Sequence, residues 1–191
     1  AKTLNLLAVA HNYRQQGKQI VLIKPEIDDR FGREFVKSRA GLQEKADLLV
    51  DESTVIERSL LRGIHCVLVD EAQFVSVKLV EQLRDIASND HIPVICYGLR
   101  TDFRTKLFAG ARRLLELADS IEEVKTTCAF CERKATLNLK HVNGTDTLDG
   151  PSVDLGADEK YYPVCHACYE SQIASALRDR DWGGEKNAGN I

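Results

Sequence analysis

The stretch HCVLVDEAQF, residues 65–74, joins a run of apolar residues to two adjacent carboxylates. A continuous apolar run of this length is typical of a strand that is buried on both faces, as in a parallel sheet. We therefore expect a buried strand over 65–74, with the carboxylates Asp70 and Glu71 toward its end. A carboxylate at the carboxyl end of such a strand lies at the crevice where open parallel sheets bind ligands. The alternative is that these acids are simply the polar end of a strand that emerges into solvent.

Three other segments predict strands. The apolar runs QIVLIKP at 19–25 and PVICYGL at 93–99 resemble the central stretch, and IEEVKTTC at 121–128 has the composition of a further strand. The segment between the first two runs, residues 26–50, is polar and charged and predicts a loop with short elements.

Helical periodicity accompanies these strands. Apolar residues recur at helical spacing at the N-terminus, where Gly17 ends the pattern, and again over 77–87 and 106–118. The N-terminal pattern predicts that Leu4, Leu7, Ala8 and His11 form its buried face. Alternating strands and helices predict an α/β fold, with a parallel sheet that carries helices on both faces.

The character of the chain changes near residue 125. The expected strands become short, and Asn143-Gly144 is a strong signal for a two-residue hairpin turn. We expect a nucleotide-binding α/β domain over 1–125, a small second domain over 126–182, and a disordered tail over 183–191.

The composition limits the range of functions. A net charge of -3 gives no electrostatic reason to expect nucleic acid as a partner. No apolar run is long enough to cross a bilayer, and no targeting segment is recognisable. Because the cysteines do not suggest a secreted disulfide scaffold, we expect a cytoplasmic protein. Since the sequence contains no methionine, we also expect that residues preceding Ala1 belong to the protein.

Four of the six cysteines form two C-x₂-C pairs, Cys128 with Cys131 and Cys165 with Cys168, separated by 33 residues. Paired cysteines of this kind favour a closed tetrahedral Zn²⁺ site, which would make the second domain a zinc ribbon with a long loop. A redox dithiol pair and two disulfides are the alternatives. Cys66 and Cys96 lie within apolar runs and resemble small buried hydrophobic residues.

Lys2 and Thr3 directly precede the first helical pattern. At the end of a phosphate-binding loop, the lysine contacts ATP phosphates and the threonine hydroxyl ligates Mg²⁺. The alternative is an exposed charge and a helix cap. The order of elements supports the first interpretation, because Asp70 would then lie at the same sheet edge and could hold Mg²⁺. Glu71 would be available to accept a proton.

Aromatic residues follow the third strand in YGLRTDFRTKLF at 97–108. Leu99, Phe103 and Phe108 could line a pocket for a planar base, or they could belong to the hydrophobic core. Arg30, in EIDDRFG, could contact phosphate or could be a solvated loop charge.

Taken together, Lys2-Thr3, DDRFG at 28–32, VDEAQF at 69–74, YGLRTDF at 97–103 and the cysteine pairs resemble the zinc-containing type II thymidine kinases. The resemblance extends from Ala1 to about Tyr169. One departure is Ala1, since the family's phosphate loop has glycine before the lysine.

The resemblance implies roles for individual residues. Lys2 and Thr3 would hold ATP phosphates and Mg²⁺, Asp70 would be the magnesium-associated acid, and Glu71 would be the general base. Arg30 would lie near the transferred phosphate. The walls of the thymine pocket would be Phe74, Leu99, Phe103 and Phe108, and a lasso loop over 156–162 would contribute Gly156 and Tyr161.

The implied function is transfer of the ATP γ-phosphoryl group to thymidine, with Mg²⁺ and a structural Zn²⁺. The resemblance further implies a homotetramer that dTTP inhibits. The alternative function is a P-loop and zinc-ribbon protein that binds nucleotides or nucleic acid without turnover.

Overall fold

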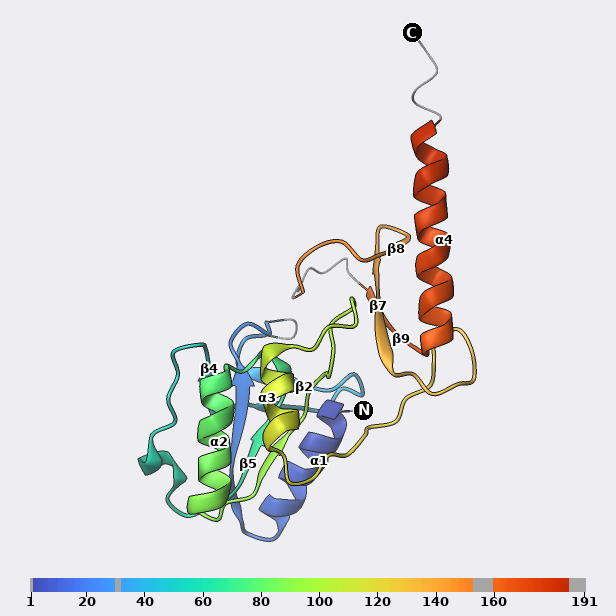
Figure 1. Cartoon of the computed structure of the whole chain (residues 1–191). Coiled ribbons are helices and arrows are strands. Elements are labelled where there is room, and N and C mark those ends of the chain that lie inside the picture. Colours follow the sequence, from blue (N-terminus) through green and yellow to red (C-terminus); the bar gives the residue numbers. More distant parts are fainter. Residues whose placement is uncertain (1, 30–31, 153–159, 186–191) are drawn as a thin grey trace. The chain divides into compact units, whose positions relative to one another are not determined.

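The computed structural model describes residues 2–29, 32–152 and 160–185 (Figure 1). The chain forms two compact units, one of Ala1–Arg100 with Leu107–Val124 and one of Thr101–Lys106 with Lys125–Ile191. The short segment Thr101–Lys106 thus belongs to the second unit, although both of its flanks belong to the first.

The first unit is built on a four-stranded parallel sheet with the order β4-β1-β5-β6. Its strands are β1 (Gln19–Pro25), β4 (Leu48–Val50), β5 (Ile64–Val69) and β6 (Val94–Cys96). The central strands β1 and β5 are almost entirely buried, as their continuous apolar runs predict. The parallel sheet that we expected is therefore confirmed.

Helices cover both faces of this sheet. They are α1 (Lys2–Gln15), α2 (Val77–Asn89) and α3 (Ala109–Leu117). Alternate residues of β1 enter different cores, since Leu22 packs in one cluster with Leu6 of α1 and Ile23 packs in another with Leu79 of α2. This alternation confirms the predicted α/β architecture, in which α1 lies on one face and α2 on the other.

The buried face of α1 differs from our prediction. Leu4, Ala8 and His11 are exposed, whereas Leu6, Leu7 and Ala10 are buried. Both stripes have helical spacing, so periodicity alone could not distinguish them, and the position of the sheet decides which one is covered. Gly17 ends the helix as predicted, with φ of 70° and its N–H donating to the carbonyl of Arg14.

Three predicted strands also differ. The strand expected over 93–99 is limited to β6 (Val94–Cys96), whose residues are half-buried. The strand that we expected over 65–74 ends at Val69, because Glu71 adopts a left-handed conformation and the 3₁₀ helix η2 (Ala72–Phe74) follows. The segment 121–128 contains no strand, only an isolated bridge from Thr127 to Lys134. Its residues are mostly exposed, so it lacks the buried face that would support a strand.

The polar stretch after β1 contains a small antiparallel pair, β2 (Phe35–Lys37) with β3 (Gln43–Lys45), and the 3₁₀ helix η1 (Arg58–Leu61) lies before β5. A buried lysine of β1 holds this stretch in place. Lys24 is 1% exposed, and its Nζ donates to the carbonyls of Gly32 (3.1 Å) and Phe35 (2.8 Å). Asp28 lies 3.7 Å from the same ammonium and compensates its charge.

The second unit contains a three-stranded antiparallel sheet with the order β8-β7-β9. Its elements are β7 (Leu137–Val142), β8 (Thr145–Thr147), β9 (Lys160–Val164) and the helix α4 (His166–Glu185). Asn143 and Gly144 connect β7 to β8 with φ of 48° and 83°, which confirms the predicted two-residue hairpin turn. Residues 183–185 of the expected tail continue α4, and residues 186–191 lie outside the described residues.

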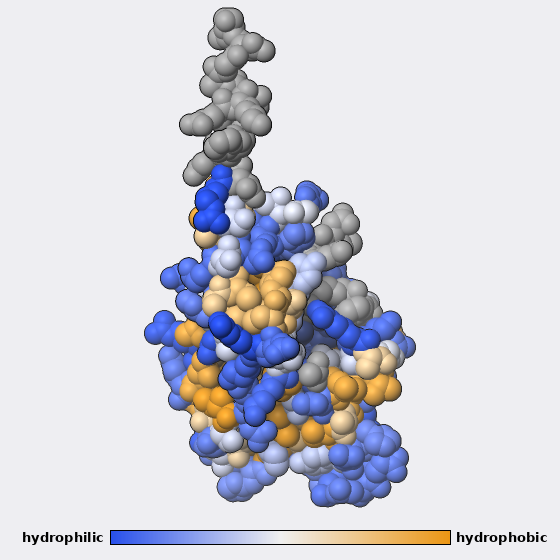
Figure 2. All heavy atoms as spheres, turned by 90° about the vertical axis from the view of Figure 1, so that its right-hand side faces the viewer, coloured by the Kyte–Doolittle hydropathy of each residue, from blue (hydrophilic) through white to orange (hydrophobic). Residues whose placement is uncertain are grey.

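On the face that Figure 2 shows, hydrophobic and hydrophilic residues are interspersed. None of the helices in the described part of the chain combines the length and the apolar character that crossing a membrane requires.

Candidate functional site

The first turn of α1 lies against the end of β5. The hydroxyl of Thr3 donates to the carboxylate of Asp70, with Oγ1 at 3.2 Å from Oδ2 and 3.5 Å from Oδ1. The charge of Lys2 also acts on Asp70. Residues that are 67 positions apart in the sequence therefore meet at the carboxyl end of the sheet, where parallel sheets bind their ligands.

Asp70 is only 3% exposed. Burial, followed by the neighbouring charge of Glu71, raises its pKa from 3.8 to about 6. The N–H of Glu71, the hydroxyl of Thr3 and the charge of Lys2 act in the opposite direction and are outweighed. A buried carboxylate beside a hydroxyl is a suitable pair of oxygen donors for Mg²⁺, and a bound cation would favour the ionised acid.

Glu71 is held in an unusual backbone conformation, with φ of 45° and ψ of 42°. The residue is 9% exposed, and its Oε2 accepts a hydrogen bond of 2.6 Å from Nε2 of Gln73. A non-glycine residue in the left-handed region is uncommon and is often found at functional sites. The turn places Glu71 directly beyond Asp70, so the two acids lie together and differ in their hydrogen-bond partners.

Sequence reasoning assigned no role to Gln73. Its Nε2 contacts Glu71, and its Oε1 accepts a hydrogen bond of 2.9 Å from the N–H of Leu99. The signal that could have identified Gln73 is its place in VDEAQF, directly after the two acids. In the structure this polar residue is buried.

Two of the predicted pocket residues meet in the first unit. The rings of Phe74 and Phe108 are 5.6 Å apart between centroids and lie edge to face at 83°. Phe74 ends η2, and Phe108 occupies the position directly before α3. Leu99 is tied to the same region, since its N–H binds Gln73, the residue before Phe74.

Two others meet in the second unit. The ring centroids of Phe103 and Tyr161 are 6.4 Å apart, and Phe103 is 2% exposed. Lys140, which sequence reasoning did not single out, places its Nζ 4.9 Å from the centre of the Phe103 ring. The hydroxyl of Tyr169 donates to the carbonyl of Phe103 at 2.6 Å and fixes the backbone of this segment. Arg30 and Gly156 lie outside the described residues.

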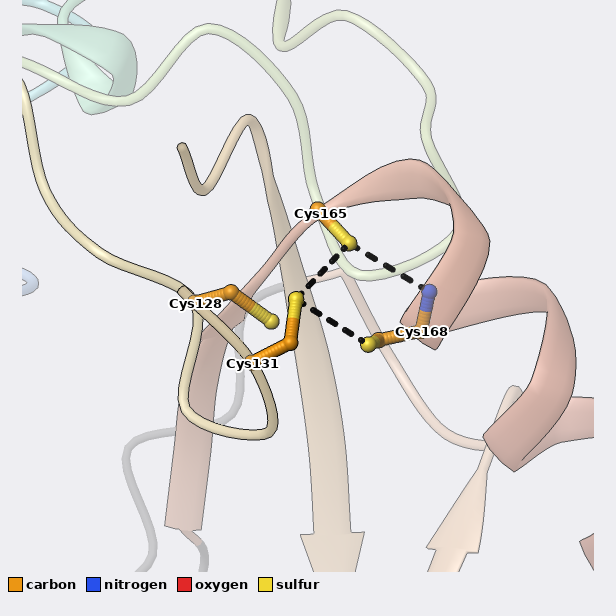
Figure 3. A group of neighbouring side chains, drawn as sticks. All are labelled: Cys128, Cys131, Cys165 and Cys168. Carbon is orange, nitrogen blue, oxygen red and sulfur yellow. Dashed lines mark hydrogen bonds between the residues drawn. The ribbon is translucent and has the colours of Figure 1, made fainter. Parts of the chain in front are cut away.

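The four paired cysteines converge on one point (Figure 3). All four Sγ atoms lie within 4.8 Å of one another. Sγ of Cys131 is 3.7 Å from that of Cys165 and 3.7 Å from that of Cys168. A tetrahedral Zn²⁺ with bonds of about 2.3 Å places its sulfurs about 3.8 Å apart, whereas a disulfide requires about 2.05 Å. The cluster therefore fits a zinc ion.

Backbone N–H groups support this cluster. Phe130 donates to Sγ of Cys128 at 3.4 Å, and Cys168 donates to Sγ of Cys165 at 3.5 Å. The N–H of Cys168 is the main cause that lowers the pKa of Cys165. Donors aimed at sulfur favour the thiolate, which is the form that binds metals.

The remaining cysteines have a different character. Cys66 is fully buried, as the sequence indicated. Cys96 is half-buried at the end of β6, and its partial burial raises the pKa of its thiol to about 12.

Comparison with known proteins agrees with this geometry. The model of the family described as Thymidine kinase matches residues 1–169. Thymidine kinases of Lactiplantibacillus plantarum and Enterococcus faecalis are each 42% identical over 170 residues, which cover 88% of this chain and 88% of each relative. The thymidine kinase of Streptococcus gordonii is 40% identical over 170 residues, covering 88% of this chain and 89% of that protein. The resemblance that the motifs indicated is confirmed, and the chain belongs to the thymidine kinase family.

Proposed function

We propose that this protein transfers the γ-phosphoryl group of ATP to the 5′-hydroxyl of thymidine and releases thymidine 5′-phosphate. Family membership supports the reaction. The observation that carries the proposal is the hydrogen bond from Thr3 to Asp70, with Glu71 adjacent. This contact supports the proposal, because a P-loop kinase requires its phosphate end and its acids to lie close together.

At the phosphate end, Lys2 would contact the ATP phosphates, and Thr3 with Asp70 would hold Mg²⁺. The metal, when bound with ATP, neutralises charge on the transferred group. The side chains contribute by fixing the donor in line with its acceptor and by excluding water, which accounts for most of the catalysis in phosphoryl transfer. Arg30 remains a proposed contact of the transferred phosphate on the basis of the family resemblance.

Glu71 would orient the 5′-hydroxyl of thymidine and accept its proton as the oxygen attacks phosphorus. Glu71 lies in a left-handed turn and accepts a hydrogen bond from Gln73. Thr3 donates to Asp70 instead. One acid is thereby available for the metal and the other for the proton.

For the nucleoside, we propose contacts with Phe74, Leu99, Phe103, Phe108, Gly156 and Tyr161. The ring pairs Phe74 with Phe108 and Phe103 with Tyr161 support this assignment, because aromatic surfaces suit a planar base. Zn²⁺ at the four cysteines would be structural, since a shell of four thiolates leaves no open position for substrate. Assembly as a homotetramer, inhibition by dTTP and a cytoplasmic location are proposals that follow the family resemblance.

Steady-state kinetics of Glu71→Gln test the proposal. We expect kcat to fall by about 10²–10⁴-fold, the usual contribution of a positioned base, while thymidine affinity is mostly retained. Near-normal kcat in this variant would remove Glu71 from its role. ADP release that depends on thymidine in the unmodified protein would separate a kinase from a nucleotide-binding protein without turnover.

A further inference from the structure

We propose that Gln73 is a positioning residue that orients Glu71 and couples it to the backbone at residues 97–99. This inference rests on the proposed role of Glu71 as the general base. Gln73 is 3% exposed, and both ends of its side-chain amide are engaged, by Glu71 at 2.6 Å and by the N–H of Leu99 at 2.9 Å.

The chemistry of the two partners determines which way the amide faces. The backbone N–H of Leu99 can only donate, so the amide oxygen must face it. The NH₂ group then necessarily faces Glu71, where it can only donate and a carboxylate oxygen is a suitable acceptor. The hydrogen bond from Leu99 therefore turns the NH₂ group of Gln73 toward Glu71.

The backbone of the segment after β6 keeps Gln73 in this position. A Cβ atom at Gly98 would lie 2.9 Å from Oε1 and 3.0 Å from the backbone N of Gln73, so a side chain at this position would crowd Gln73. The N–H of Ala72 donates to the carbonyl of Tyr97 at 2.8 Å, which joins η2 to the same segment. The glutamine side chain consequently has little freedom to rotate away from Glu71.

The functional consequence follows from the requirements of proton transfer. A general base must be within hydrogen-bond reach of the hydroxyl that it deprotonates, and a misplacement of about 1 Å can reduce the rate about 10²-fold. Glu71 reaches its position through a left-handed backbone, which non-glycine residues rarely adopt. The bond from Gln73 restricts the carboxylate at the end of that turn.

A double-mutant cycle on the full-length zinc-containing protein tests the inference. The four proteins are the unmodified enzyme, Glu71→Gln, Gln73→Met and the double variant. We expect Gln73→Met to lower kcat by about 10–100-fold with KM for ATP changed less than about twofold. In the Glu71→Gln background the same substitution should change kcat by less than about threefold, because Gln73 acts through Glu71.

A matched control exists in α2. Gln82 also uses both ends of its amide, accepting from the N–H of Ile56 at 2.9 Å and donating to the carbonyl of Ile56 at 2.6 Å. Gln82→Met therefore loses two comparable bonds away from the acids, and its kcat should stay within about twofold of the unmodified enzyme. A similar kcat loss in Gln82→Met and Gln73→Met would show a general structural effect and overturn the inference.

Gln73→Glu separates the two bonds if Gln73→Met folds poorly. A carboxylate can still accept from Leu99 but cannot donate to Glu71 when ionised, so we expect kcat to fall as in Gln73→Met. If substitution of Gln73 lowers kcat by the same factor in the unmodified enzyme and in Glu71→Gln, the inference about Gln73 is contradicted, whereas the proposed role of Glu71 is not. Unchanged kcat in Glu71→Gln itself would instead contradict the proposed base.

Discussion

Asp70 combines burial, a hydroxyl partner and a neighbouring acid, and this combination makes its ionisation depend on the folded state. Its pKa is about 6 in the folded protein and 3.8 ordinarily, with burial as the main cause. Between these values the folded protein binds more protons than the unfolded chain, so the free energy of unfolding decreases as pH rises. The contribution of Asp70 is therefore fully present below pH 3.8 and is lost as pH rises through about 6.

We predict that Asp70→Asn removes this dependence, because asparagine does not ionise. In the absence of nucleotide, the free energy of unfolding of the variant should rise relative to that of the unmodified protein by at most about 3 kcal/mol between pH 4 and pH 7. Urea unfolding at several pH values measures the difference. The exposed Asp119→Asn is the control, and parallel pH profiles for Asp70→Asn and the unmodified protein would contradict the prediction.

The contacts of individual residues were predictable where a short motif specifies them. They were not predictable where a side chain binds the backbone of a segment far away in the sequence. The motif placed Thr3, Asp70 and Glu71 at one sheet edge, and the structure brings Thr3 and Asp70 into contact. The contact of Gln73 with Leu99, 26 positions away, depends on a left-handed turn and on a close approach of two segments. No periodicity in the sequence encodes either feature.

At the scale of elements, the contact between α3 and η2 is set by the absence of a side chain at Gly110. A Cβ atom there would lie 2.5 Å from the carbonyl oxygen of Val75 and 2.9 Å from that of Gln73. These are backbone atoms and cannot rotate away, so the helix or η2 would have to move. Because η2 begins directly after Glu71, its position matters for the acid pair.

We predict that Gly110→Ala destabilises the protein by about 1–3 kcal/mol, the usual effect of overpacking, despite the gain of about 1 kcal/mol in helix propensity. It should also lower kcat, because η2 is displaced. Urea unfolding and steady-state kinetics measure the two effects. Arg112→Ala, on the exposed side of the same helix, should change stability by less than about 0.5 kcal/mol. Gly110→Ala as stable and active as this control would contradict the proposed contact.

Elements were predictable in proportion to how fully their residues are buried. The run at 19–25 coincides with β1 because nearly all of its residues lie in a core. The segment 121–128 contains β-branched residues but is more polar and mostly exposed, and it forms only one bridge. For α1, the helix was predicted and its buried stripe was not, since Leu6 and Leu4 belong to two stripes of equal spacing.

For the whole molecule, alternation of strands and helices and the cysteine pairs were sufficient to predict an α/β sheet and a second, cysteine-framed region. The assignment of Thr101–Lys106 to the second unit was not predictable, because it follows from long-range packing such as the bond from Tyr169 to Phe103. The second unit has a small core of residues around Leu139 and Val164, and that core includes Cys128 and Cys165. A metal at those cysteines would therefore act as part of the core.

We predict that removing zinc with a chelator unfolds the second unit and abolishes thymidine binding while the parallel sheet remains folded. Without the metal, the cysteine pairs of 128–131 and 165–168 are no longer joined, and a small core rarely suffices for stability. Hydrogen exchange should lose protection in β7 and β9 and keep it in β1 and β5. Calorimetry with thymidine alone, which needs no Mg²⁺, should show no binding until Zn²⁺ is restored. Normal thymidine binding by metal-free protein would contradict the coupling, and equal loss of protection in β1 and β5 would show that the chain unfolds as one cooperative unit.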